Sequence, residues 1–152
     1  MLILEGFKNK KILEVNESSK SDEVKVHLSW IRFMYAYTIV GAGGIGLALL
    51  IVPNLAMSLL GIPAEEPIMA GVAYSVWVAF GILSIFGLRS PTKFVPVLLL
   101  QFTYKVVWFM GVIVPILVTG VLPSFGFTMI AIFATFVIGD VIVIPWRYLL
   151  SK

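Results

Sequence analysis

The chain contains no cysteine and only one histidine, His27. The missing thiols exclude disulfide exchange and a cysteine nucleophile. A single histidine cannot ligate a haem iron from both sides. The apolar part of the chain also offers no paired carboxylates and no cluster of metal-ligating residues. We therefore expect no catalytic residue and no metal site, and an enzyme is the weakest of the function classes considered below.

Charged residues are also scarce, at 12% of the chain, whereas about a quarter is usual in soluble domains. Hydrophobic residues make up 60%, and the mean hydropathy is +1.04. A chain of this composition belongs in a lipid bilayer. The net charge of +3 is compatible with a nucleic-acid partner, but cations that flank membrane spans explain it better. Nucleic-acid binding is therefore set aside.

Long apolar runs are present instead of the short alternating segments of a membrane β-barrel. Each of four runs has about the 17 to 25 residues that an α-helix needs to cross the hydrocarbon core. The sequence thus predicts an all-α integral membrane protein, in which residues 28–152 form a four-helix bundle behind an N-terminal arm, residues 1–27. The expected spans are about 28–52, 68–88, 94–119 and 125–145.

The cations are distributed unevenly along the chain. Of eleven Lys and Arg residues, all but Lys105 lie in the N-terminal arm, near the start of the first span, between spans two and three, or at the C-terminal end. The two other loops have none. Because cytoplasmic loops carry an excess of Lys and Arg, we expect both termini to be cytoplasmic. The expected location is the cell inner (cytoplasmic) membrane, which the chain would cross several times.

Three glycines of the first span, Gly41, Gly43 and Gly46, match the G-x-G-x-x-G fingerprint of dinucleotide-binding proteins. That fingerprint requires a strand, a tight turn and a helix, whereas these glycines lie in a continuous apolar run. Small residues at four-residue spacing let membrane helices approach closely. We therefore expect helix packing, with Gly44 and Gly46 at helix contacts and no bound nucleotide.

The third span carries Lys105 near its middle. A cation at this depth is costly, so it should face the protein interior and have an anion nearby. Asp140 is the only acidic residue in the apolar part of the chain that qualifies. Helix spacing places Gln101 and Trp108 in one stripe with Lys105, and Tyr104 lies beside them. We expect this stripe to face neighbouring helices.

Counting residues from the turn between spans three and four places Lys105 and Asp140 at similar depth. One interpretation is a buried ion pair that fixes helix register. The other is a ligand, proton or ion site, because ionisable groups inside membranes are functional-site candidates. In the second span, Tyr74 and Trp77 share a face that either packs within the bundle or lines an apolar cavity.

Several features resemble the DoxX-like group of small bacterial membrane proteins: the four-span layout, the proline-rich segment after the first span, the YKxxW sequence at Tyr104, Lys105 and Trp108, and the ending at 140–145. The resemblance covers most of residues 28–148. It implies a four-helix bundle that is associated, in some members, with redox or quinone-linked partners. Sterol-isomerase-like bundles share the general architecture and hold an amphiphile in an intramembrane cavity.

These observations favour a binding or accessory module that holds a lipid-, sterol- or quinone-like amphiphile in an aromatic cavity with a Lys/Asp polar centre. The alternative is a small transporter or proton-coupled carrier in which Lys105 and Asp140 alternate between paired and unpaired states. The chain shows no internal repeat and no pair of broken helices, which disfavours the carrier.

No cofactor is evident. Membrane lipids are the expected partners, and a bound quinone or lipid, a second copy of the chain and another membrane protein are left open. The candidate ligand or ion-pair residues are Lys105, Asp140, Gln101, Tyr104, Trp108, Tyr74 and Trp77.

Overall fold

The structure, a computed structural model, describes residues 27–63 and 67–150. The chain divides into two compact units, one of residues 27–144 and one of residues 1–26 with 145–152. Of the second unit, the structure describes the short helix α9, Trp146–Leu150, and the residue before it. The predicted N-terminal arm lies outside the described residues, apart from His27.

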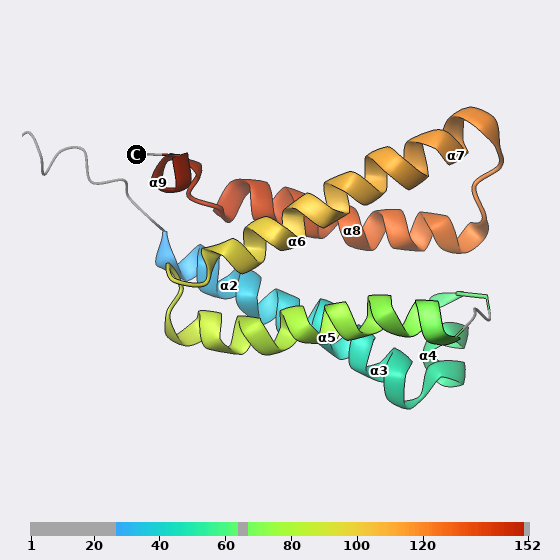
Figure 1. Cartoon of the computed structure of the whole chain (residues 1–152), viewed down its shortest axis with the longest axis horizontal. Helices are drawn as coiled ribbons and strands as arrows, with labels where there is room; N and C mark the ends of the chain where they lie inside the picture. Colours follow the sequence, from blue (N-terminus) through green and yellow to red (C-terminus); the bar gives the residue numbers. More distant parts are fainter. Residues whose placement is uncertain (1–26, 64–66, 151–152) are drawn as a thin grey trace, which may run out of the picture. The chain divides into compact units, whose positions relative to one another are not determined.

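Within residues 27–144, the described chain is helical and contains no strand (Figure 1). Four helical stretches are long and apolar enough to cross a membrane: Leu28–Ile51, Pro67–Arg89, Val95–Thr119 and Ser124–Val143. Their ends lie within two residues of the predicted spans. For the described residues, the prediction of an all-helical fold with four helices long and apolar enough to cross a membrane is confirmed.

The second and fourth spans are single helices, whereas wider π-helical turns interrupt the first and the third. The π-helical turn of the third span ends two residues before Pro115. A proline removes a backbone donor and crowds the preceding turn, and a π-helical turn is one way in which a helix absorbs this disturbance. The elements are α2 (Leu28–Thr38), a π-helical turn (Ile39–Gly44), α3 (Ile45–Ile51), α5 (Pro67–Arg89), α6 (Val95–Trp108), a second π-helical turn (Phe109–Ile113), α7 (Val114–Thr119) and α8 (Ser124–Val143).

The spans pack as two antiparallel pairs (Figure 1). α2 and α3 lie along α5, and α6 lies along α8. Further contacts join α2 to α8 and α5 to α6. All four spans therefore contribute side chains to the centre of this unit.

The outer surface of the spans is apolar, unlike that of a soluble protein. Large hydrophobic side chains cover it, and Val40 is 75% exposed and Ile68 is 77% exposed. Polar and charged side chains are buried at the centre, together with hydrophobic ones. This arrangement is expected when the surrounding solvent is lipid, because polar groups must then be satisfied inside the protein.

The connection between the first two spans contains a short helix, α4, Pro53–Leu60. A proline is tolerated in its first turn because the N–H there has no intrahelical acceptor. Gly61 ends the helix with a φ of 68°, a left-handed conformation that glycine adopts without strain. Ala56 of α4 belongs to the same buried cluster as Tyr74 of α5. The proline-rich connection thus contains a helix that packs against the first pair of spans.

Glycines bring α5 into backbone contact with the first span. A Cβ atom on Gly46 would lie 2.8 Å from the backbone oxygen of Tyr74, and one on Gly81 would lie 2.7 Å from Cα of Gly43. These distances leave no room for a side chain, so small residues are required. The packing prediction is therefore right for Gly46. At Gly44, which lines a groove beside α5, the nearest atom to an added Cβ would be the backbone oxygen of Ile39 at 3.9 Å, so the contact with α5 does not require a glycine there.

Candidate binding site

Every span contributes a buried polar side chain to the centre of the unit. Thr38 comes from α2, Ser84 from α5, Gln101 and Lys105 from α6, and Asp140 from α8, and none is more than 1% exposed. Gln101 and Lys105 lie one helical turn apart on the same face of α6. A polar group buried in a membrane protein needs a partner within the protein. The partners of these five side chains therefore determine what the site can do.

Gln101 links three of the spans. Its Nε2 donates to Oγ1 of Thr38 at 3.2 Å and faces both carboxylate oxygens of Asp140 at 3.2 and 3.4 Å. Thr38 donates its own hydroxyl proton to the backbone oxygen of Met34 at 2.8 Å, which leaves its lone pairs free to accept from Gln101. The carboxylate of Asp140 is thus held by a neutral amide.

The amine of Lys105 has no hydrogen-bond partner in the part of the chain that the structure describes. It lies instead among aromatic rings, with Nζ 4.4 Å from the ring centre of Phe136, 4.5 Å from that of Tyr104 and 5.5 Å from that of Phe133. Aromatic faces attract a cation, but they offer no lone pair to an N–H donor. Lys105 therefore keeps unused hydrogen-bond donors inside the bundle.

Lys105 and Asp140 do not form the direct ion pair that was one interpretation of the sequence. Among the described residues no salt bridge joins them, because the carboxylate turns to Gln101 and the amine lies among the rings. Their charges still act on each other through space. The two groups are thus buried in the same interior, but neither satisfies the hydrogen-bonding capacity of the other.

Phe133 of α8 is the centre of an aromatic cluster. Its ring centroid lies 5.8 Å from that of Trp77 on α5, 6.0 Å from that of Tyr104 and 4.8 Å from that of Trp108 on α6. The indole N–H of Trp77 also donates to the hydroxyl oxygen of Tyr104. Tilted and edge-on ring pairs of this kind are favourable. Three aromatic side chains predicted from the sequence are thus brought together by one that was not predicted.

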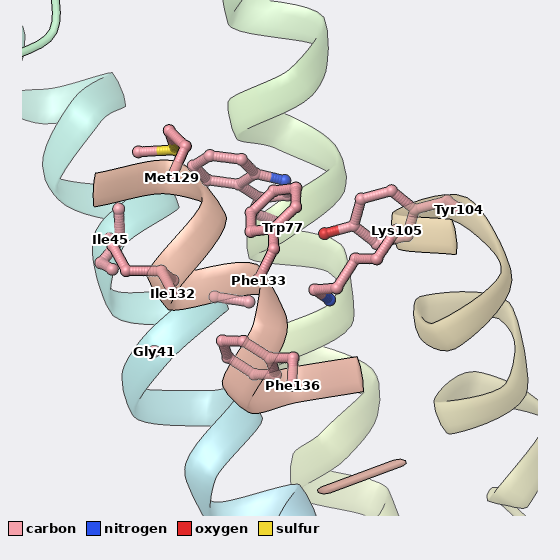
Figure 2. Close-up of a pocket in the computed structure, with 10 residues that line it drawn as sticks. Gly41, Ile45, Trp77, Tyr104, Lys105, Met129, Ile132, Phe133 and Phe136 are labelled. Atoms are coloured by element: carbon pink, nitrogen blue, oxygen red, sulfur yellow. The ribbon is translucent and has the colours of Figure 1, made fainter. Parts of the chain in front are cut away.

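A narrow inner cavity of about 10 Å³ lies beside this cluster. Lys105 and Tyr104 line it from α6, and Trp77 lines it from α5 (Figure 2). Figure 2 shows the Lys105 amine pointing from α6 toward Phe133 and Phe136 of α8. The amine is therefore aimed into the cavity.

A larger outer cavity of about 190 Å³ adjoins the inner one. Tyr74 and Trp108 line it, and their rings are among the largest of its walls. Trp77, Met129 and Phe133 line both cavities, so the two are neighbours. The aromatic face of the second span thus lines a cavity, which was one of the two interpretations of the sequence.

Thr38, Phe133 and Phe136 complete the site, and sequence reasoning did not single them out as site residues. Phe133 and Phe136 precede Asp140 by seven and four residues, which places all three on one face of α8. This spacing is the signal in the sequence that marks them. No comparable signal marks Thr38, because threonine is common among packing residues of membrane helices.

Comparisons with protein families, curated proteins and solved structures found no match for this chain. Its similarity to the DoxX-like group stays a prediction. The function proposed next therefore rests on the geometry of the site.

Proposed function

We propose that this protein is a small binding module of the cell inner membrane that holds an amphiphilic molecule between its helices. The polar end of the amphiphile meets Lys105. Its apolar body lies against Tyr74, Trp77 and Trp108, in the outer cavity.

The amine of Lys105 carries this proposal. A buried donor without an acceptor costs about 1 to 3 kcal/mol, and a charged one costs more. The Lys105 amine is in this situation, and it faces a cavity instead of a packed wall. An acceptor supplied by a bound molecule would remove this cost, and the free energy recovered would favour binding.

The outer cavity supplies the complementary part of such a site. Small-molecule sites in proteins are mostly apolar and aromatic, and a few polar groups fix the orientation of the ligand. The walls of the outer cavity are formed by aromatic and aliphatic side chains, and the amine of Lys105 lines the neighbouring inner cavity. A molecule with an apolar body and one polar end matches this arrangement.

The proposed orientation in the membrane rests on the charges at the ends of the spans. Arg32 near the start of α2, Arg89 at the end of α5 and Lys93 in the following turn lie at one end of the antiparallel helices. The loops at the other end have no Lys or Arg. The cationic end is therefore assigned to the cytoplasm.

Cysteine labelling tests this orientation, since the native chain has no thiol. An impermeant thiol reagent added to intact cells should label a Leu122→Cys variant and spare a Ser18→Cys variant. The reverse pattern would contradict the orientation.

Native mass spectrometry of protein extracted from its membrane tests the proposed function. We expect an amphiphile to copurify with the wild type and with Lys93→Met, which removes an exposed lysine outside the site. The same adduct should be lost from Lys105→Met. A wild-type protein without adduct, or an adduct retained equally by all three proteins, would contradict the proposal.

A second candidate function is proton-coupled transport. It is favoured by one observation, namely that Lys105 and Asp140 are both buried and are not locked to each other. Groups that can change partners are typical of proton relays. Purified protein in liposomes should then carry protons down an imposed pH gradient, and Asp140→Asn should abolish the flux. Equal flux in empty liposomes would exclude this function.

A further inference from the structure

The size of the inner cavity limits what can meet the amine of Lys105. A cavity of about 10 Å³ holds roughly one water-sized atom. A bulky head group such as a phosphate or a choline does not fit beside Lys105. The group that reaches the amine is therefore a single small acceptor atom.

A lone water satisfies this site poorly. A buried water usually makes about three hydrogen bonds. The polar groups that line the inner cavity belong to Lys105, Tyr104 and Trp77, and the Trp77 N–H is already used by the Tyr104 hydroxyl, so a water would find two partners, the Lys105 amine and the Tyr104 hydroxyl. An oxygen atom that is attached to an apolar body needs only the one bond from Lys105, and its body replaces the remaining partners by packing.

The charges of the interior restrict the acceptor further. Lys105 and Asp140 are the only buried charged side chains in the described part of the chain, and Arg32, Arg89 and Lys93 are exposed at the helix ends. A cationic Lys105 and an anionic Asp140 together give the interior no net charge. A ligand carboxylate would leave the interior with a net negative charge in a medium of low dielectric constant, whereas a neutral acceptor keeps the balance.

The outer cavity indicates how much of the body is enclosed. An engineered apolar cavity of about 150 Å³ accepts benzene, and the outer cavity measures about 190 Å³. It therefore encloses about one ring or a short folded stretch of chain, and any further rings or a longer chain must continue out of the cavity.

We propose that the bound amphiphile ends in a neutral carbonyl oxygen, which accepts a hydrogen bond from the Lys105 ammonium, while the adjoining part of its chain or a single ring fills the outer cavity. This inference rests on the proposed function and narrows it to one class of head group. It requires no covalent step.

A matched series of probes tests the head group in the whole protein. The probes are C14 chains brominated at the same position that end in a methyl ketone, a carboxylate, an ammonium or a plain methyl group, each added to phosphatidylcholine vesicles containing the protein. Bromine quenches indole fluorescence on contact. Trp30→Phe and Trp146→Phe substitutions in the reporter protein leave Trp77 and Trp108, which line the outer cavity, as the only tryptophans.

We expect the ketone to quench at about tenfold lower mole fraction than the plain chain, because a hydrogen bond to a charged donor is worth at least that factor. The carboxylate should bind more weakly than the ketone, and the ammonium probe should bind worst of all. In the Lys105→Met variant, the ketone should quench no better than the plain chain. In the Lys93→Met variant, the order and the mole fractions of the four probes should be the same as in the reporter protein.

Three outcomes would overturn the inference. Tighter binding of the carboxylate than of the ketone would show that the site prefers an anionic head group to a neutral one. Equal binding of ketone and plain chain in the wild type, a comparison that needs no variant at Lys105, would show that the amine does not select the ligand. Failure of every probe, while native mass spectrometry still shows a copurifying amphiphile, would refute the carbonyl class and leave the proposed function intact. If nothing copurifies either, both are refuted.

Discussion

The contact between the first span and α5 and the site around Lys105 use opposite means to space their helices. At the contact, Gly43 and Gly46 let two backbones touch, and no Cβ atom fits. Around Lys105, the rings of Phe133 and Trp77 stand between the helices and leave cavities beside them. Small residues bring two backbones into contact and leave a groove of about 210 Å³ beside them, whereas large flat side chains hold the helices apart around the buried amine of Lys105. The closed contact should therefore govern stability, and the open region should govern binding.

The closed contact should be the part most sensitive to added volume. Gly46→Leu places a side chain where the α5 backbone and the Cβ of Trp77 already lie within 3 Å of the first added atom. We expect it to destabilise the protein by about 3 kcal/mol or more. The thermal unfolding midpoint in detergent measures this loss.

Gly44→Leu is the matched control, because it adds the same side chain to the same span at a position where an added Cβ meets no atom of another span within 4 Å. It should change stability by less than about 0.5 kcal/mol. Equal losses for the two variants would mean that the glycines act through helix propensity and not through the contact with α5.

The hydrogen bonds of Asp140 should give the next largest effect. Gln101→Leu removes the donor that faces both carboxylate oxygens and leaves a buried acidic group without it. We expect a loss of about 2 to 3 kcal/mol in the free energy of unfolding. The double variant Gln101→Leu with Asp140→Leu should recover part of this loss, because the stranded carboxyl group is gone.

The same double-variant approach compares the two partners of Asp140. Lys105→Met with Asp140→Leu should recover less than the Gln101 pair does, since no direct ion pair joins Lys105 to Asp140. A larger recovery for the lysine pair would assign the main partnership to the ion pair instead.

Tyr35 should give a smaller effect, because it anchors the edge of the closed contact. Its hydroxyl donates to the backbone oxygen of Pro91 at 2.9 Å, and its ring covers Gly87 of α5. Tyr35→Phe keeps the ring and loses the hydrogen bond, so we expect a loss of about 1 kcal/mol. A variant as stable as the wild type would show that this bond is replaced without cost.

The smallest effect is expected on the outer surface, where Tyr37 and Thr135 share a hydrogen bond of 2.7 Å. Hydrogen bonds between membrane helices average only about 0.6 kcal/mol. Tyr37→Phe should therefore shift the unfolding midpoint barely beyond error. A loss as large as that of Gln101→Leu would place part of the polar core at this surface.

The four spans could be predicted because their signal is long and simple. A helix that crosses a bilayer needs a fixed length of apolar residues, and that requirement alone located the ends of the spans closely. The π-helical turn of the first span was not predicted, because it depends on how the glycines of the first span meet α5 and α8.

The site was predictable only in part. Periodicity on one helix gathered Gln101, Lys105 and Trp108 on one stripe, but it carries no information about which partner each one meets. The hydrogen bonds between Gln101 and Asp140 depend on how α6 and α8 cross. The residue pattern of one helix does not determine that crossing. The sequence left an ion pair and a ligand, proton or ion site as alternatives, whereas the structure gives the carboxylate an amide partner and aims the amine into a cavity.

A distance measurement by solid-state NMR on the protein in lipid bilayers tests most directly whether Asp140 is paired with Gln101 and not with Lys105. With ¹⁵N in the Lys105 amine and the Gln101 amide and ¹³C in the Asp140 carboxyl group, dipolar recoupling reports both separations in one sample. Our account predicts a strong coupling from Gln101 to Asp140 and none from Lys105 at ion-pair distance, which is about 4 Å between nitrogen and oxygen. A Lys105 amine in contact with the Asp140 carboxyl group, with Gln101 detached from it, would contradict the account.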